Sequence, residues 1–448
     1  MYKDRHIYSS LEKHKDNQKI TILVGARQVG KTTLMTALYE KVRNQHRALF
    51  FDLDIYSHYE KVSSYENFIN TLKLNGYEAR EKDRFFVFLD EFQRYADISR
   101  VLKSVCDHHP RIKVYASGSS SLSINEQIQE SLAGRKRIVP IYPLSFAEYL
   151  NFREQYDLIQ QLERLSNIRS DSLPKLIPDA FRELEQFLIY GGYPEVALAP
   201  ASEKRDVLES IFDLYVKKDL VDFLKIERIS HAKTLIHQLA VNHGQETKYS
   251  QLAQVAGIDE KTAKNYLEVL RETFIITVLR PWFTNRNKEL VKMPKIYFQD
   301  SGVRNYFINN FNPGHIRPDM SFLFEGFVIS ELIKDGFPAQ NIKFWRTKAQ
   351  YEVDLVLEEG AIVKPVEIKY KKQLRASDGR GLQQFKAAYP KTQDLFMVNL
   401  ATNRPGKGTC HYLSPFELYR LCTPPSTVDF SGHYGRDYPR ESRNGNPE

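Results

Sequence analysis

The stretch "ITILVGARQVGKTTLM", residues 20–35, decides how the first part of the chain must fold. An apolar run precedes Gly25, the motif GxxxxGKT extends from there to Thr32, and a helical pattern follows. Glycines allow a tight turn whose backbone N–H groups surround phosphates, and the next helix presents its positive N-terminal end to them. The stretch therefore predicts a strand, a phosphate-binding loop and a helix.

The residue types in this loop indicate that it binds ATP with Mg²⁺. Lys31 is expected to contact the outer phosphates, and the hydroxyl of Thr32 is expected to bind the magnesium ion. The predicted nucleotide-binding residues are Gly25, Ala26, Arg27, Gln28, Val29, Gly30, Lys31, Thr32 and Thr33. Because a short motif also arises by chance, the prediction needs a second element.

That second element is "RFFVFLDEF", residues 84–92, an apolar run that ends in two acids. Asp90 is predicted to hold the magnesium ion through water, and Glu91 to orient and deprotonate the water that attacks the phosphate. The alternative is a glycine-rich turn beside an unrelated acidic strand end. The two motifs together favour an ATPase.

Around these motifs, short runs of Val, Ile and Phe alternate with helical segments as far as about residue 150. The runs are "KITILVG", "RALFFDLD", "RFFVFLDE" and "KVYASGS". This alternation predicts the α/β class, with a mostly parallel, doubly wound sheet.

Two further residues are candidates for a part in the reaction. Ser117, in "KVYASGSSSL", is expected to sense the γ-phosphate or the water, with a simple serine-rich strand exit as the alternative. The neighbouring Ser119 and Ser120 are equal candidates. Arg135 is a candidate for stabilising the transferring charge, within this chain or across a subunit boundary. The alternative for Arg135 is a surface position at a helix end.

The chain has 448 residues, enough for two to four domains. Its net charge of +8 favours an anionic partner, above all DNA or another nucleic acid, with a mildly basic surface as the alternative. Three cysteines without CxxC spacing support neither a disulfide framework nor a cysteine zinc site. No apolar run suits a signal peptide or a bilayer span, so we expect a soluble cytoplasmic protein.

Changes of periodicity along the chain predict five segments. They are a P-loop ATPase core at 1–148, a helical lid segment at 149–200, a helical winged-helix-like domain at 201–285, a mixed α/β domain at 286–423, and a disordered tail at 424–448.

Residues 248–270, "KYSQLAQVAGIDEKTAKNYLEVL", have a helix-turn-helix pattern around Gly257. An exposed second helix would present polar and basic side chains to DNA, although such units also serve purely for protein packing. The predicted core is Leu252, Ala253, Val255, Ala256, Ala263, Tyr266, Leu267 and Leu270, and the predicted exposed residues are Lys261, Thr262, Lys264 and Asn265.

Residues 351–372 predict a hairpin, "YEVDLVLEE", then Gly360 and Ala361, then "IVKPVEIKYKK". A two-residue turn at this pair sets a register in which Asp354 lies opposite Glu367, with Lys369 on the same face. Opposed carboxylates repel unless a cation lies between them. The hairpin therefore indicates a Mg²⁺ site, at which Lys369 would activate water or balance phosphate charge.

At this point the chain resembles a known family, the AAA-type ATPases of bacteria and archaea whose C-terminal half is a domain of unknown function. The resemblance rests on "GARQVGKTTLM", "FLDEFQR", "SGSSSL", "AGRKRIVPIYPLSFAEYL", "YGGYPEVAL", "KMPKIYFQDSGVRNY" and "FEGFVISEL", which together cover nearly the whole chain except the tail. It implies an ATP-binding module, a region of the winged-helix type, and a C-terminal domain similar to restriction endonucleases.

The restriction-endonuclease-like arrangement places a helical glutamate beside the metal. Glu325, Asp354, Glu367 and Lys369 match that pattern, and Gln383 lies where related nucleases often have a polar accessory residue. The alternatives are a half-exposed strand with extended lysines, a Glu325 satisfied by a core arginine, and a nuclease-like fold without activity.

Two hypotheses follow. In the first, ATP turnover changes how the rest of the chain engages DNA or RNA, which the C-terminal domain can cut. In the second, the protein is an ATP-gated switch or scaffold that binds a protein partner, and the nuclease-like domain is inactive. The sequence identifies no self-interface, and so leaves the oligomeric state open.

Overall fold

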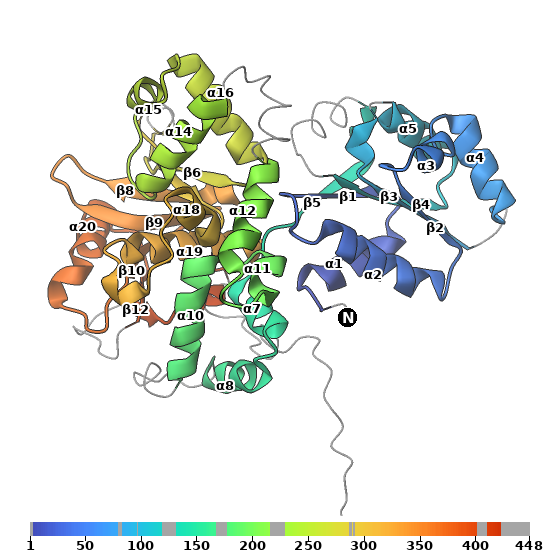
Figure 1. Ribbon diagram of the computed structural model, residues 1–448. Coiled ribbons are helices and arrows are strands. Elements are labelled where there is room, and N and C mark those ends of the chain that lie inside the picture. The colour runs from blue at the N-terminus through green and yellow to red at the C-terminus, as the bar shows by residue number, and fades with distance from the viewer. Residues whose placement is uncertain are drawn as a thin grey trace, which may run out of the picture. The chain divides into compact units, whose positions relative to one another are not determined.

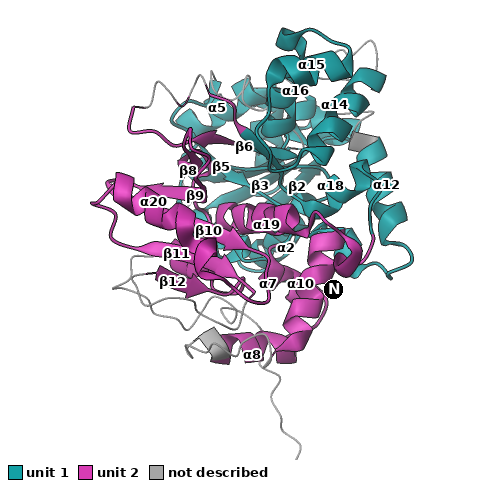
Figure 2. Ribbon diagram, turned by 90° about the vertical axis from the view of Figure 1, so that its left-hand side faces the viewer, with its two compact units in different colours: residues 1–144, 190–278, 295–311 teal, residues 145–189, 279–294, 312–448 magenta. Residues whose placement is uncertain are grey.

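The computed structural model describes residues 3–78, 83–95, 97–118, 131–166, 177–215, 229–285, 289, 292–400 and 410–422. The predicted tail at 424–448 lies outside these ranges, as do Ser119 and Ser120. The chain forms two compact units, one of residues 1–144, 190–278 and 295–311, the other of residues 145–189, 279–294 and 312–448 (Figure 2). The boundaries of the five predicted segments stay a prediction.

The first unit contains the parallel sheet that the alternating runs predict (Figure 1). The sheet order is β2-β3-β4-β1-β5, and every neighbouring pair is parallel. The strands are β1 Ile20–Val24, β2 Ala48–Asp52, β3 Phe85–Asp90, β4 Ile112–Gly118 and β5 Lys136–Pro140. The sequence patterns missed β5, because this edge strand begins with two basic residues and buries only Val139.

Helices cover both faces of this sheet, as a doubly wound fold requires. One face packs in a cluster with Leu34 and Leu38 of α2, and the other in a cluster with Phe68 of α4 and Leu102 of α5. The helices are α1 Ile7–Lys13, α2 Lys31–Arg43, α3 Tyr56–Glu60, α4 Tyr65–Leu74 and α5 Ile98–His108.

The remainder of the first unit is mainly helical. It contains α11 Pro194–Leu198, α12 Lys204–Tyr215, α14 Ile229–Val241, α15 Tyr249–Ala256, α16 Glu260–Glu272, α18 Ser301–Phe307 and strand β7 Lys295–Phe298. Gly191 lies in the break between α10, which ends at Tyr190, and α11, which begins at Pro194. A side chain at Gly191 would collide with the Asp300 carboxylate, whose Oδ2 accepts a hydrogen bond from Gly192 N at 2.7 Å.

The two helices predicted around Gly257 are present as α15 and α16. Gly257 has a φ of +67° and ends α15, and Asp259 caps α16 by accepting a hydrogen bond from Thr262 N at 2.9 Å. Seven of the eight predicted core residues are buried, but Val255 is 47% exposed. That part of the prediction was wrong, because only residues at the spacing of Leu252, Ala253 and Ala256 lie on the buried face of α15.

The second unit holds the helices α7 Phe146–Phe152, α8 Tyr156–Ser166, α10 Pro178–Tyr190, α19 Met320–Lys334 and α20 Arg380–Ala388. Helices α7, α10 and α19 pack through the rings of Phe146, Phe187 and Phe327. The C-terminal mixed sheet has seven strands in the order β12-β11-β10-β9-β8-β6-β7. Besides β7, they are β6 Ile276–Pro281, β8 Ile342–Arg346, β9 Glu352–Glu359, β10 Ile362–Lys369, β11 Leu395–Asn399 and β12 Cys410–Leu413.

Candidate functional site

The loop between β1 and α2 has the backbone that its glycines require. Gly30 caps α2 with a φ of +92°, in the left-handed region that glycine adopts without strain. Gly25 lies so close to Ile141 that a Cβ atom there would be 2.1 Å from the Ile141 carbonyl oxygen. Gln28 also has a positive φ, at +59°. The predicted strand, loop and helix are therefore present.

Within this loop, the ammonium group of Lys31 lies against the backbone. Its Nζ donates hydrogen bonds to the carbonyl oxygens of Gly25, at 3.1 Å, and Ala26, at 2.7 Å. Thr32 and Thr33 are exposed on the first turn of α2. Arg27 is half-buried, Gln28 is exposed, and Ala26 and Val29 are buried.

The acidic end of β3 lies beside the end of β4. Strand β4 pairs with β1 on one side, where Leu23 lies opposite Ser117, and with β3 on the other, where Leu89 lies opposite Ala116. The Ser117 hydroxyl donates a hydrogen bond to Oδ1 of Asp90, and both residues are buried. Asp90, Ser117 and the start of the phosphate loop thus share the carboxyl edge of one sheet.

Glu91 leaves the strand in an unusual conformation. Its φ is +53°, which costs energy for a residue with a Cβ atom. Its backbone N–H donates to Ser117 Oγ at 3.3 Å, and Gln93 Nε2 donates to its Oε2 at 2.6 Å. These bonds hold the Glu91 carboxylate at the end of β3. No local pattern singled out Gln93 as its partner.

The predicted hairpin is β9 and β10, with the register that the sequence indicated. The pairs extend from Glu359 opposite Ile362 to Leu355 opposite Val366, and the next pair in this series is Asp354 opposite Glu367. Gly360 has a φ of +64°. The two carboxylates are therefore brought to one place.

Lys369 provides the positive charge between these carboxylates. Its Nζ donates to Oε1 of Glu367 and, at 3.4 Å, to Oδ2 of Asp354, which also accepts a hydrogen bond from Ile368 N at 2.7 Å. The opposed acids therefore have a cation between them without a metal ion, and the Mg²⁺ site stays a prediction. A lysine two positions along the same strand points to the same face and offsets the repulsion.

Burial nevertheless disfavours the charged form of Glu367. Loss of solvent, followed by the charge of Asp354, raises the pKa of Glu367 to about 8. Its Oε2 is buried and accepts no hydrogen bond from the residues that the structure describes. Burial lowers the pKa of Lys369, but Asp354 and Glu367 outweigh that effect and raise it overall.

The other predicted members of this site lie on two helices. Glu325 is buried on α19, and Gln383 is exposed on α20. In the part of the chain that the structure describes, no group of three or more His, Cys, Asp or Glu residues is arranged to hold a metal ion. Asp354, Glu367 and Lys369 are brought together, whereas Glu325 does not complete a three-carboxylate cluster with them.

The comparisons with known proteins agree with the geometry of the phosphate loop. Residues 17–150 match the family model described as an AAA domain. This match supports an AAA-type ATPase family. Residues 181–314 and 320–419 match two models that are each described as a domain of unknown function, the second being DUF4143.

Similar proteins span much of the chain. An uncharacterized protein of Methanocaldococcus jannaschii is 26% identical over 347 residues, covering 76% of this chain and 72% of that protein. A second one from the same organism is 25% identical, and the match spans 63% of this chain and 61% of that protein. An uncharacterized protein of Mycobacterium tuberculosis is 24% identical over 395 residues, covering 87% of this chain and 77% of that protein.

Among solved structures, the Walker-type ATPase of Pyrococcus abyssi aligns with 68% of this chain and 96% of its own, at 15% identity and a TM-score of 0.44. The RuvB Holliday junction branch migration motor of Thermotoga maritima aligns with 65% of this chain and 95% of its own, at 14% identity and a TM-score of 0.31.

Arg5 contacts the phosphate loop, although α1 and β1 lie between the two in the sequence. Its Nη1 donates to the carbonyl oxygen of Val29 and its Nη2 to that of Tyr142, both at 2.9 Å. Arg5 thereby ties the loop to the segment after β5. Sequence inspection missed it, because an arginine before a helix has no local signature.

Arg135 lies away from the phosphate loop. It directly precedes β5, and its carbonyl oxygen accepts a hydrogen bond from Ile20 N, so it marks the N-terminal edge of the sheet. Its guanidinium pairs with Asp107, with Nε 2.5 Å from Oδ1. A role for Arg135 at the nucleotide of its own chain is therefore excluded, because the strands separate the two edges by roughly 3.3 Å per residue. A role across a subunit boundary stays a prediction.

The exposed face of α16 carries balanced charge. Lys264 pairs with Glu260 at 2.6 Å, and Arg271 pairs with Glu268 and Glu272. The exposed residues predicted for DNA contact are indeed outside the core, but Thr262 hydrogen-bonds to its own cap at Asp259. The helix therefore offers little net positive charge to phosphates.

No helix in the described ranges has the length and apolar character needed to cross a bilayer.

Proposed function

We propose that the protein binds and hydrolyses ATP at the phosphate loop and couples its nucleotide state to the engagement of nucleic acid. Lys31 would contact the outer phosphates, and Thr32 and Asp90 would hold Mg²⁺, which would supply positive charge to offset that of the phosphates. Glu91 would accept a proton from the attacking water, with Gln93 fixing its orientation. Ser117, bonded to Asp90, fits the role of a sensor.

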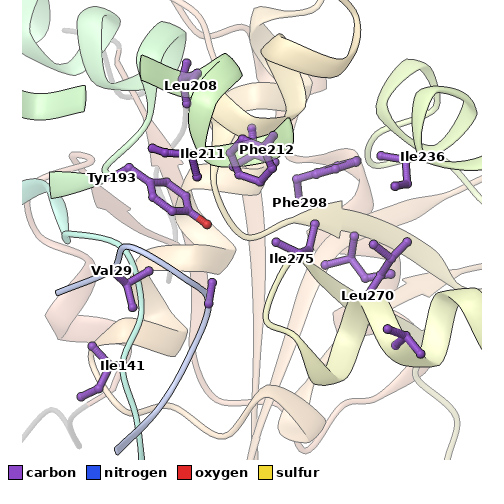
Figure 3. Close-up of a cluster of buried hydrophobic side chains, with 14 of the residues drawn as sticks. Val29, Ile141, Tyr193, Leu208, Ile211, Phe212, Ile236, Leu270, Ile275 and Phe298 are labelled. Carbon is purple, nitrogen blue, oxygen red and sulfur yellow. The ribbon is translucent and has the colours of Figure 1, made fainter. Parts of the chain in front are cut away.

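The observation that carries the coupling is the position of the loop in the core. Ala26 and Val29 of the loop are buried in one apolar cluster with Tyr193 and Phe212, which belong to the helical part of the first unit (Figure 3). The same cluster continues to Leu267 and Leu270 of α16. Packed interiors resist compression, so a change in the loop is transmitted through them.

The test is ATP turnover with and without nucleic acid. We expect DNA or RNA to change the rate of phosphate release from ATP by the wild-type protein, and the Lys31→Ala protein to release no phosphate under either condition. A substitution within the shared cluster, Phe212→Ala, should weaken the response to nucleic acid more than it weakens basal turnover. Unaltered phosphate release in Lys31→Ala and Asp90→Ala proteins would contradict the ATPase assignment itself.

A second candidate function is Mg²⁺-dependent cleavage of nucleic acid at the C-terminal domain, which we infer to be restriction-endonuclease-like. The observation that favours it is the buried Oε2 of Glu367, which lacks a hydrogen-bond partner and lies where a cation would satisfy it. Asp354 and Glu367 would hold the ion, and Lys369 would be released to a phosphate or a water. Mg²⁺ would supply a polarised water there.

Degradation of plasmid and single-stranded DNA by the purified protein tests this second candidate. Cleavage is expected with Mg²⁺, and it should be lost in Glu367→Ala but not in Glu359→Ala, which removes an acid from the other end of β9. If neither nucleic acid is bound at low salt, the alternative gains support: an ATP-gated switch or scaffold with a protein partner. A pull-down with the ATP-bound protein then identifies that partner.

A further inference from the structure

A polar groove lies at the N-terminal ends of strands in the five-stranded sheet, whereas the phosphate loop lies at the C-terminal ends. It occupies about 720 Å³ between the end of α2, the starts of β2 and β3, and the end of α4. The residues that give it its character are Arg43, His46, Arg47, Asn75, Asp83 and Arg84, and we call it the basic groove. Its position follows from the sheet, because β2 begins at Ala48 and β3 begins at Phe85.

Among the described residues that line this groove, three arginines face a single carboxylic acid, Asp83. Arg84 is held in place by two neutral oxygens, since its Nη1 and Nη2 donate to the carbonyls of Lys15, at 3.0 Å, and Asp16, at 2.8 Å. Such bonds orient the guanidinium without cancelling its charge. Arg43 pairs with Glu40, but both side chains are about half exposed, and solvent screens such a pair strongly.

The choice of residue types points to phosphate. The permanent cations among the described residues of the groove are all arginines, whose planar fork binds phosphate oxygens in pairs. The side-chain amides of Asn44, Gln45 and Asn75 add hydrogen-bond donors that suit phosphate and sugar oxygens. These are contacts that fix a nucleic acid in place without selecting a base sequence.

The contrast with α16 decides between two surfaces of the same unit. On α16 the three bases are matched by three acids, and two of the bases are paired within the helix. Non-specific binding to nucleic acid depends on net positive charge that displaces counterions. The basic groove has that excess of charge, and α16 does not.

We infer that the basic groove binds the phosphate backbone of nucleic acid, without sequence preference, on the sheet edge opposite the ATP site. This inference rests on the proposed engagement of nucleic acid and names its location. Because the groove includes the end of α2, whose first turn carries Lys31 and Thr32, one helix joins the two sites. Nucleotide state and nucleic-acid affinity would then be coupled through α2.

The test measures the binding of the full chain to fluorescein-labelled oligo(dT), and to a labelled duplex, by anisotropy over a series of salt concentrations. We compare Arg43→Gln/Arg47→Gln in the groove with the matched control Lys261→Gln/Lys264→Gln on α16, which removes the same charge. The groove variant should weaken binding by about tenfold for each lost charge-assisted contact. For oligo(dT), the slope of the logarithm of the binding constant against the logarithm of the salt concentration should become shallower by about 1.4. Each lost phosphate contact accounts for about 0.7 of this change.

The control variant should stay within about twofold of the wild-type affinity, since screened surface pairs contribute little. Basal ATP turnover and the urea unfolding midpoint should be unchanged in both variants, which separates lost binding from lost folding. If the wild-type protein binds and the groove variant keeps its affinity and salt dependence, the groove is not the site and the proposed function survives. If the wild-type protein binds neither probe at low salt, the nucleic-acid part of the proposed function fails together with this inference.

Discussion

The phosphate loop and the β9–β10 hairpin both place a lysine among oxygen atoms, but the oxygens differ in charge. Lys31 donates to the neutral carbonyls of Gly25 and Ala26, whereas Lys369 donates to the carboxylates of Asp354 and Glu367. Phosphate oxygens can replace neutral partners and gain an ion pair in doing so. A metal ion at the hairpin must instead displace a lysine that already offsets the two acids. Lys31 is thus available to bind an anion, whereas Lys369 is already paired with two acids.

The largest effect is expected for Lys31→Ala. Removing this charge should lower the rate of phosphate release by about 10³, the upper end of what one preorganised electrostatic contact contributes. Lys41→Ala is the matched control, because Lys41 lies on the same helix and pairs with Glu12 at the far end. If both variants turned over ATP equally, Lys31 would have no special role in catalysis. The proposed difference between Lys31 and Lys369 would then be wrong.

Glu91→Gln should have the next largest effect. The amide keeps the shape of the side chain but cannot accept the proton of the water, so turnover should fall by at least about 10². Binding of a fluorescent ATP analogue should persist, because Glu91 is not among the loop residues. A variant that lost nucleotide binding as well as turnover would point to a structural role, for which the strained φ of Glu91 gives a reason.

A pH effect is expected at the hairpin. Because the pKa of Glu367 is raised to about 8 in the folded protein, above its ordinary 4.5, the folded state binds more protons than the unfolded state between these values. This contribution to the free energy of unfolding is complete below about pH 4.5 and is lost as the pH rises through about 8. Urea unfolding over this range should show a smaller decline in Glu367→Gln than in the wild type.

Added Mg²⁺ sharpens the same measurement. If the ion can displace Lys369, it should stabilise the wild-type protein more at pH 8 than at pH 5, and have no such effect on Glu367→Gln. The Glu359→Gln variant is the control, since it removes an acid from the same hairpin, on β9 next to the turn. Equal behaviour of all three proteins would mean that Mg²⁺ does not displace Lys369 from Asp354 and Glu367.

The smallest effect is expected for Arg135→Ala. Its guanidinium pairs with Asp107 at the edge of the sheet away from the phosphate loop, so the turnover of dilute protein should not change. The measurement is phosphate release over a range of protein concentrations. A loss of activity that appears only as the concentration rises would reveal the predicted contribution to a neighbouring subunit.

Local chemistry made much of the fold and of both sites predictable. The strand, loop and helix around Lys31 follow from glycine positions and apolar runs, and the register of Asp354 and Glu367 follows from one turn between two strands. These features depend on residues that are close in sequence, where the covalent chain itself limits the geometry.

Other features depend on contacts between distant segments and left no local signal. Arg5 reaches Val29 from the segment before α1, and β5 becomes a strand because it pairs with β1, although Val139 is its only buried residue. Val255 has the apolar character of a core residue but lies on the outer side of α15. In each case the position of the residue depends on how other elements pack, and that packing cannot be inferred from the neighbouring sequence.

By itself the sequence determined that the chain has a phosphate loop, an acidic strand end and a hairpin with two opposed acids, because each feature depends on a short run of consecutive residues. The tertiary structure alone decided that Lys369 provides the cation between those acids, that Arg135 lies at the far edge of the sheet, and that arginines from separate segments meet in one groove. The physical reason is that charges act through space: the partners of a charged group are set by folding, not by its neighbours in sequence.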